Sequence, residues 1–167
     1  GAQPGIDIIS KAFLRQGDTV ITESPTYTGA IAVFKSRGAN IIDVELEEDG
    51  LNMKILEYRR KKDRPGLIDA IPTFHNPTGY SYSGSKRREM LELAEKYNCF
   101  IIEDNYVSEL DFKGGNFLPL KSQDKNSRVI FIKSFSKIFM PVLRLGFMIV
   151  PQNLRSNILE AKHATDI

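Results

Sequence analysis

The stretch 129–146 reads VIFIKSFSKIFMPVLRLG, and it decides both the fold and the site that we expect. It opens with four apolar residues, a short run typical of a buried strand. Lys137 stands five residues beyond the end of that run and comes directly after Ser134, Phe135 and Ser136. A partly buried lysine loses its proton more readily and then attacks carbonyl groups, so Lys137 is a candidate for forming a Schiff base with an aldehyde. Taken alone, the stretch is equally compatible with a solvated lysine in a loop.

Short apolar runs alternate with segments of helical periodicity along the chain. The expected strands are Thr19–Thr22, Ile41–Val44, Leu67–Pro72, Phe100–Glu103, Val129–Lys133 and Leu145–Val150. The expected helices cover 4–13, 27–37, 51–62, 86–97 and 153–164, and 45–50 is expected to be a loop. Within 51–62, Leu51 is expected to face inward and the charged run 59–62 to face water. This order predicts a three-layer α/β fold in which a mainly parallel sheet carries helices on both faces.

Composition narrows the function classes. The 23 basic and 21 acidic residues are scattered along the 167-residue chain, so no basic stripe indicates a nucleic-acid surface in this segment. The single cysteine, Cys99, lies in an apolar run and is expected to be a buried thiol, which fits the cytoplasm. No apolar run approaches the length of about 20 residues that a membrane span needs. His75 and His163 have no ligand-spaced companions, so we expect no metal site.

Polar residues follow the ends of several predicted strands. Asn76, Asp104 and Lys137 each lie just past such an end. Because parallel strands in an α/β sheet bind ligands beyond their carboxyl ends, these three residues are expected to lie near one site. Glu103 is expected to point away from Asp104, because neighbouring residues of a strand face opposite sides.

Chemistry on an aldehyde cofactor requires an amine, an anion beside the pyridine nitrogen, donors near the phenolic oxygen, and a phosphate cradle. Asp104 is the candidate anion, although a lone aspartate is more often a helix or turn cap. Asn76 and Tyr106 are candidate donors to the phenolic oxygen. Alone, Asn76 would be interpreted as an Asx turn and Tyr106 as an amphipathic residue at the edge of a site.

The candidate phosphate ligands are hydroxyls, one arginine and backbone amides. They are Ser134, Ser136, Arg144 and the amides of Ala2 and Gln3 at the start of the first helix. Tyr27 is a candidate for stacking on the cofactor ring, although packing into the core is the more common role of a tyrosine.

Six motifs occur together and span nearly the whole chain. They are 1–3 (GAQ), 23–27 (ESPTY), 76–79 (NPTG), 103–106 (EDNY), 134–137 (SFSK) and 144–146 (RLG). In this combination the sequence resembles the large domain of fold-type I pyridoxal-phosphate enzymes, the aspartate-aminotransferase superfamily. The resemblance implies that Lys137 holds pyridoxal 5'-phosphate and shuttles a proton, and that Asp104 pairs with the pyridine nitrogen. It also implies the roles given above for Asn76, Tyr106, Tyr27 and the phosphate ligands.

Within the superfamily, the sequence is similar to 2-aminoadipate-type aminotransferases and to the aminotransferase-like domain of MocR regulators. In those regulators a GntR-type winged helix precedes such a domain. Tyr106 follows Asp104 by two positions, as in the regulators. The two functions therefore stay open: amino-group transfer between an amino acid and a 2-oxo acid, or effector sensing by a transcriptional regulator whose DNA-binding part lies outside this chain.

We expect residues 1–167 to be the cofactor-binding large domain of a longer protein, without its N-terminal and C-terminal parts. The family's arginine for the substrate carboxylate belongs to a C-terminal small domain, and Arg155 is not assigned that role. The resemblance implies a homodimer whose subunits share active sites. A third possibility is that the isolated chain keeps the fold and binds cofactor weakly or not at all.

Overall fold

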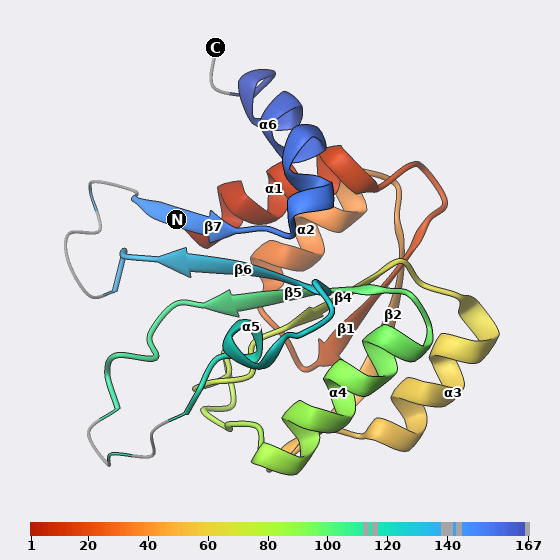
Figure 1. Ribbon diagram of the computed structural model, residues 1–167, viewed down its shortest axis with the longest axis vertical. Helices are drawn as coiled ribbons and strands as arrows, with labels where there is room; N and C mark the ends of the chain where they lie inside the picture. The colour runs from red at the N-terminus through yellow and green to blue at the C-terminus, as the bar shows by residue number, and fades with distance from the viewer. Residues whose placement is uncertain (112–113, 115–116, 138–141, 143–144, 166–167) are drawn as a thin grey trace.

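Strands rich in isoleucine and valine form the centre of the molecule. The computed structural model describes residues 1–111, 114, 117–137, 142 and 145–165, and within that part seven strands form one sheet in the order β3-β2-β1-β4-β5-β6-β7 (Figure 1). They are β1 (Thr19–Ser24), β2 (Asn40–Glu47), β3 (Gly50–Leu51), β4 (Leu67–Ala70), β5 (Phe100–Asn105), β6 (Val129–Ser134) and β7 (Gly146–Ile149). Strands β2, β1, β4, β5 and β6 run parallel, and β3 and β7 pair antiparallel at the two edges. The expected mainly parallel sheet is confirmed.

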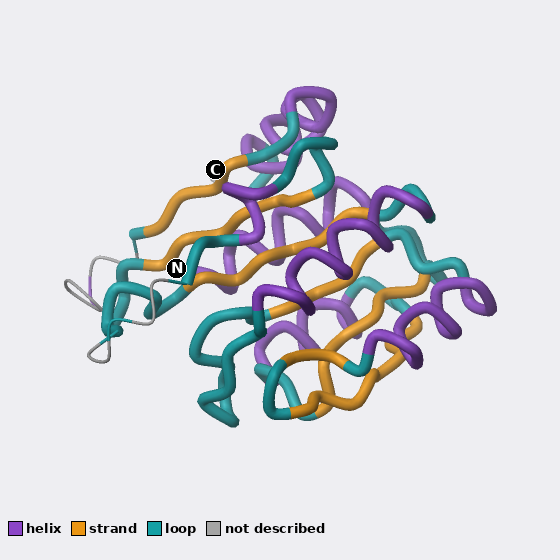
Figure 2. The backbone as a smooth tube through the Cα atoms, turned by 60° about the horizontal axis from the view of Figure 1, so that its bottom comes forward, coloured by secondary structure: helices purple, strands orange, loops and turns teal. Residues whose placement is uncertain are grey.

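Helices cover both faces of this sheet (Figures 1 and 2). One face carries α1 (Ala2–Phe13), α2 (Thr28–Ser36) and α6 (Arg155–His163), the last preceded by the short 3-10 helix η2 (Gln152–Leu154). The other face carries α3 (Met53–Asp63), α4 (Gly84–Lys96) and α5 (Leu120–Gln123). The three-layer prediction is confirmed. Within the described part of the chain, none of the helices combines the length and the apolar character needed to cross a membrane.

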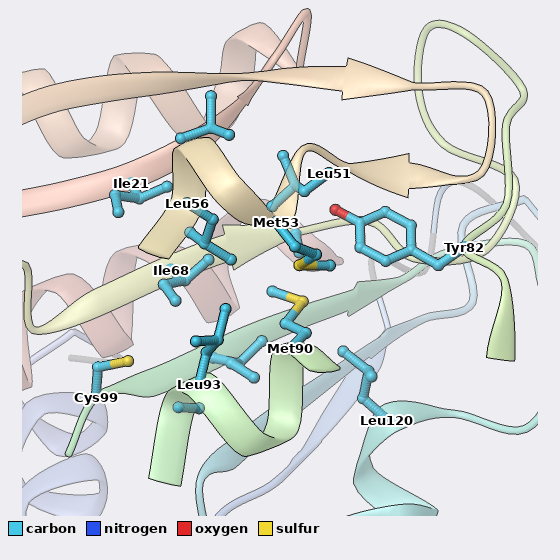
Figure 3. Close-up of a cluster of buried hydrophobic side chains, with 14 of the residues drawn as sticks. Ile21, Leu51, Met53, Leu56, Ile68, Tyr82, Met90, Leu93, Cys99 and Leu120 are labelled. Atoms are coloured by element: carbon cyan, nitrogen blue, oxygen red, sulfur yellow. The ribbon is translucent and has the colours of Figure 1, made fainter. Parts of the chain in front are cut away.

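Each face has its own hydrophobic core, because successive residues of a strand point to opposite sides. In β1, Val20 joins the core under α1 and α2, while Ile21 joins the core under α3 and α4. Figure 3 shows the second core, in which Ile21 and Ile68 of the sheet face Leu56 of α3 and Met90 of α4. Burial on both faces explains why the strand sequences are almost continuously apolar.

Two expectations at 45–62 are wrong. The expected loop at 45–50 is instead part of a hairpin: β2 continues to Glu47, and Gly50 and Leu51 return as β3 with Leu46 opposite Leu51. Leu51 is buried, as expected, but it belongs to this strand and not to the helix. Helix α3 starts at Met53, and its cap is the Asn52 side chain, which accepts a hydrogen bond from the Ile55 amide at 3.1 Å.

Arg60 is the exception in the charged run 59–62, which was expected to face water. Its side chain is buried, because its guanidinium donates to the Tyr97 carbonyl and lies 5.8 Å from the centre of the Tyr97 ring. Long basic side chains can bury their stems in this way while the charged end finds a partner.

Helix α5 was also not expected. It is only four residues long, too short for a periodic pattern to indicate it.

The carboxyl ends of β1, β4, β5 and β6 meet at one edge of the sheet, where β5 extends two residues beyond its expected end and includes Asp104. The antiparallel strand β7 pairs with β6 at the side of the sheet, next to these carboxyl ends. Gly146 of β7 lies opposite Ser134 of β6, and a Cβ atom built on Gly146 would lie 2.6 Å from the Lys133 carbonyl oxygen.

We expect Gly146→Ala to destabilise the fold by about 1–3 kcal/mol, because the contact is with backbone and the two strands must move apart to relieve it. Urea unfolding measures the change. Gly66→Ala is the control, since a Cβ atom there meets nothing within 4 Å, and it should change stability by less than about 0.5 kcal/mol. Equal stability of the two variants would contradict the close packing of β7 on β6.

Candidate active site

A cavity of about 290 Å³ opens at the carboxyl edge of the sheet, beside the start of α1. Its size is close to the lower end of the range for small-ligand sites. Nine of the ten residues predicted for the site line it. They are Ala2, Gln3, Tyr27, Asn76, Asp104, Tyr106, Ser134, Ser136 and Lys137. The tenth, Arg144, lies outside the described residues. Gly1 and Ile71 complete the lining and were not predicted.

Asp104 is the buried acid of the cavity, with 4% of its surface exposed. Burial raises the pKa of its carboxyl to about 7, and the nearby charge of Glu23 adds to the rise, while Lys133 opposes it. No described residue forms a hydrogen bond with Oδ1 of Asp104. A buried carboxylate without a partner is costly, so this oxygen would gain from a cationic or hydrogen-bond-donating ligand group.

Two further buried acids lie near Asp104. Asp69 of β4 and Glu23 of β1 are 2% and 1% exposed. Burial raises the pKa of Asp69 well above its ordinary value, and the charges of Asp104 and Glu23 raise it further. Three buried acids thus lie together behind the cavity, an arrangement that disfavours ionisation of all three and that a bound cation would offset.

Glu103 faces away from the cavity, as expected. Its two carboxylate oxygens accept hydrogen bonds from the backbone amides of Leu120 and Lys121 at the start of α5, each at 2.8 Å. Burial raises its pKa to about 6, although these two amide bonds oppose the rise. Glu103 thus holds α5 on the sheet, and the acid available to the cavity is Asp104.

Lys137 lies in a turn beyond β6 and lines the cavity, but its side chain is exposed. The sequence left a partly buried and a solvated lysine equally open, and the exposed position is the observed one, in the turn that follows the end of β6 at Ser134. Ser134 is buried, and its hydroxyl accepts a hydrogen bond from the Ser136 amide at 3.3 Å. The Ser136 hydroxyl has no hydrogen-bond partner among the described residues.

The start of α1 forms another wall of the cavity. The helix begins at Ala2, and its N-cap Gly1 supplies no side-chain hydrogen bond. First-turn amides have no acceptor within their own helix, so this end attracts anions such as phosphate. The Ala2 and Gln3 candidates thus lie where an anion site requires them.

Tyr27 lines the cavity and also packs partly against the core under α1 and α2. Its hydroxyl donates to the Gln3 side chain at 3.5 Å. Its ring lies over Gly29 in the first turn of α2, where an added Cβ atom would be 2.3 Å from the ring. Gly29 therefore provides the space that the Tyr27 ring occupies. The sequence analysis missed this role, because a through-space contact with a ring leaves no signal in spacing.

The loop 71–82 brings Asn76 to the cavity. His75 and Thr78 form its tight turn: the His75 Nδ1 atom lies 3.0 Å from the Thr78 hydroxyl, which also accepts a hydrogen bond from the Tyr80 amide at 3.2 Å. Tyr106 donates its hydroxyl hydrogen to the Phe74 carbonyl of the same loop at 2.8 Å. To donate to a ligand, Tyr106 has to release this bond.

Glu23 and His75 are buried, and the sequence analysis assigned neither of them to the site. The Nε2 atom of His75 lies 3.0 Å from Oε2 of Glu23, at ion-pair distance but without hydrogen-bond alignment, and neither side chain is exposed. Among the described residues, no group of three or more histidine, cysteine or acidic side chains is arranged to hold a metal ion.

Comparisons with known proteins agree with the fold and with the resemblance to aminotransferases. The family model described as aminotransferase class I and II matches residues 1–164. The chain is 33% identical to aromatic-amino-acid aminotransferase 1 of Thermococcus litoralis over 172 aligned residues, covering all of this chain and 41% of that protein. It is 31% identical to the uncharacterized HTH-type transcriptional regulator YisV of Bacillus subtilis, covering 99% of this chain and 34% of that protein.

One solved structure is similar to this chain over nearly the whole length of the chain. Alpha-aminoadipate aminotransferase LysN from Thermus thermophilus, in complex with N-(5'-phosphopyridoxyl)-L-leucine, has a TM-score of 0.94 and 31% identity, covering 99% of this chain and 43% of that chain. The chain thus spans between about a third and about two fifths of the length of these relatives.

Proposed function

This chain belongs to the aminotransferase class I and II family, and we propose that it is the cofactor-binding domain of a protein that transfers an amino group between an amino acid and a 2-oxo acid. One observation carries the proposal: Lys137, Asp104 and the start of α1 line a single cavity. An amine, a buried acid and an anion-binding helix start are the three groups that pyridoxal 5'-phosphate needs at its aldehyde, its ring nitrogen and its phosphate.

The residues present fit this cofactor. The unpartnered Oδ1 of Asp104 can accept from a protonated ring nitrogen, and the unpartnered hydroxyl of Ser136 can donate to a phosphate oxygen. Ser134, the first-turn amides of Ala2 and Gln3, and Arg144 complete the phosphate ligands in our proposal. Asn76 and Tyr106 would hold the phenolic oxygen, and Tyr27 would stack on the ring.

When bound, pyridoxal phosphate supplies a cationic ring that accepts the electron pair released at the α-carbon of an amino acid. Lys137 would hold the cofactor at its aldehyde through Nζ, and the same amine, when free, would serve as the base that moves the proton of the amino acid's α-carbon. Asp104 would keep the ring nitrogen protonated, because a cation beside its carboxylate would lower the pKa of Asp104 and stabilise both charges.

The test is a single-turnover assay. The intact protein, loaded with pyridoxal phosphate, is mixed with amino acids of different side-chain classes, and released 2-oxo acid is quantified by mass spectrometry. We expect one equivalent of 2-oxo acid per site from at least one class. Tight cofactor binding without any release would contradict the enzymatic proposal and favour the regulator.

The second candidate is a MocR-type transcriptional regulator in which this domain senses an effector. The similarity to YisV over 99% of this chain and the Tyr106 spacing support it. A basic winged helix elsewhere in the intact protein, together with operator binding that changes on adding an amino acid, would favour this candidate. In both cases we propose a cytoplasmic homodimer of which residues 1–167 form the cofactor-binding large domain.

We expect Gly29→Ala to weaken cofactor binding about two- to tenfold, because the added methyl group displaces the Tyr27 ring from its place at the cavity. The dissociation constant of pyridoxal phosphate measures the effect. Gly84→Ala is the matched control, since Gly84 is also in the first turn of a helix and its nearest neighbour is the flexible Arg88 side chain at 3.7 Å. Unchanged affinity in Gly29→Ala would argue against stacking by Tyr27.

A further inference from the structure

Glu23 lies at the end of β1, beneath the loop 71–82, and 1% of its surface is exposed. Its carboxylate receives three groups from that loop. Oε2 accepts a hydrogen bond from the Ile71 amide at 3.0 Å and lies 3.0 Å from Nε2 of His75, and Oε1 accepts from the Tyr82 hydroxyl at 2.6 Å. The two hydrogen bonds, from the Ile71 amide and the Tyr82 hydroxyl, offset part of the cost of burying the carboxylate.

The three groups mark the beginning, the turn and the end of one loop. Ile71 follows β4, His75 precedes Asn76 in the turn, and Tyr82 stands two residues before α4. Figure 3 shows the Tyr82 ring packed beside Leu51 and Met53, so the residue that ends the loop is also anchored in the hydrophobic core. One carboxylate therefore forms hydrogen bonds with the beginning and the end of the loop and lies against His75 in its turn.

Arg87 of α4 also forms hydrogen bonds with this loop, from outside the cavity. The Arg87 guanidinium of α4 donates to the Pro72 carbonyl at 2.7 Å and to the Thr73 hydroxyl at 2.9 Å. It also donates to the Tyr82 carbonyl at 3.1 Å, so it holds both ends of the loop, but none of these bonds is made to the turn that carries Asn76. Among the described residues, the Glu23 carboxylate is the charged group that touches His75, directly beside Asn76.

We propose that Glu23 is a positioning residue, which acts through His75 and the loop 71–82 to hold the Asn76 side chain in the cavity. The inference deepens the proposed function, because it concerns how the site presents Asn76 to the phenolic oxygen of pyridoxal phosphate. A carboxylate suits this role because it has two oxygens that both accept. In Glu23→Gln one of them becomes a donor, so either the Ile71 amide or the Tyr82 hydroxyl hydrogen loses its acceptor.

The first readout needs no cofactor. In the cofactor-free protein, the side-chain amide resonances of Asn76, labelled with ¹⁵N, report its surroundings. We expect them to shift or broaden in Glu23→Gln and to stay unchanged in Glu103→Gln. Glu103 is the matched control, because it is also a buried acid that accepts two hydrogen bonds, but it holds α5 on the opposite face. Unchanged Asn76 resonances in a folded Glu23→Gln variant would overturn the proposal.

The second readout is a double-mutant cycle on the dissociation constant of pyridoxal phosphate. We expect Glu23→Gln to weaken binding about tenfold in the native background and less than about twofold in an Asn76→Ala background, because Glu23 acts through Asn76. Equal losses in both backgrounds would overturn the inference, since a general loss of structure adds to the effect of Asn76→Ala. If Glu23→Gln does not fold, Tyr82→Phe decides in its place, with an expected loss of about threefold in the native background only.

Failure of this inference and failure of the proposed function are distinguishable. If the unaltered protein binds no pyridoxal phosphate, the proposed function fails, and the resonance experiment still decides the role of Glu23. If the protein binds the cofactor and the cycle shows additive losses, the proposed function stands and the positioning role is rejected.

Discussion

Replacing Lys137 with alanine is expected to abolish covalent attachment of pyridoxal phosphate and to lower the rate of amino-group transfer by at least about 10²–10⁴-fold. Lys137 is the lysine that lines the described cavity. If Lys137 has the proposed role, its loss removes both the amine that holds the aldehyde and the base that moves the α-proton. The visible absorbance of the bound cofactor and the release of 2-oxo acid measure the two effects.

Lys133 provides the matched control, since it lies four residues earlier in the same stretch. Its amine is buried and is used within the fold, where it donates to Asn105 at 2.9 Å and pairs with Glu109. Lys133→Met should lower stability but leave covalent attachment intact. Attachment that survives in Lys137→Ala and disappears in Lys133→Met would contradict the assignment.

Replacing Asp104 with asparagine is expected to have opposite effects on stability and on function. The pKa of Asp104 is raised from 3.8 to about 7 in the folded chain, chiefly by burial. A raised pKa means that the folded state binds this proton more tightly than the unfolded state, so stability falls as pH rises between about 4 and 7. Asp104→Asn removes this penalty, which amounts to at most about 4 kcal/mol above pH 7.

The cofactor-free Asp104→Asn variant should therefore melt at a higher temperature than the unaltered protein at pH 8, with little difference at pH 4. Asp124→Asn is the opposite control. Burial raises the pKa of Asp124, but hydrogen bonds from the Arg128 and Val129 amides outweigh it and lower the pKa. This second variant should lose stability at pH 8. A lower melting temperature of Asp104→Asn at pH 8 would contradict the burial penalty at Asp104.

The same Asp104→Asn variant should transfer the amino group about 10²-fold more slowly, because a neutral amide would not stabilise the protonated ring nitrogen of pyridoxal phosphate. Single-turnover release of 2-oxo acid measures the change. A variant that is more stable but less active is expected where an acid is kept buried for function. Full activity in Asp104→Asn would show that the ring nitrogen has another partner.

The layers of the fold followed from the sequence because its strands and helices have clear periodicity. Each strand is buried on both faces and is therefore apolar throughout, and each helix between strands is long enough to repeat its pattern. The hairpin of β2 and β3 was missed because β3 has only two residues. The burial of Arg60 was missed because its acceptor, the Tyr97 carbonyl, lies 37 positions away.

Asn76, Asp104 and Lys137 could be brought together from the sequence because they lie at or beyond the predicted carboxyl ends of strands, which meet at one end of a parallel sheet. The sequence left the exposure of Lys137 open, since a lysine shortly after a strand end is compatible with both a buried and a solvated position. Glu23 was not singled out either. Its partners Ile71 and Tyr82 lie 48 and 59 positions away, and the burial of a carboxylate depends on such distant donors.

The most direct test of the central claim locates the cofactor on the chain. The intact protein is loaded with pyridoxal phosphate, reduced with borohydride, digested and analysed by mass spectrometry. We predict one reduced cofactor per chain, attached to Nζ of Lys137. Attachment to another lysine, or no attachment at all, would contradict the claim that the cavity beyond β4, β5 and β6 is a pyridoxal-phosphate site.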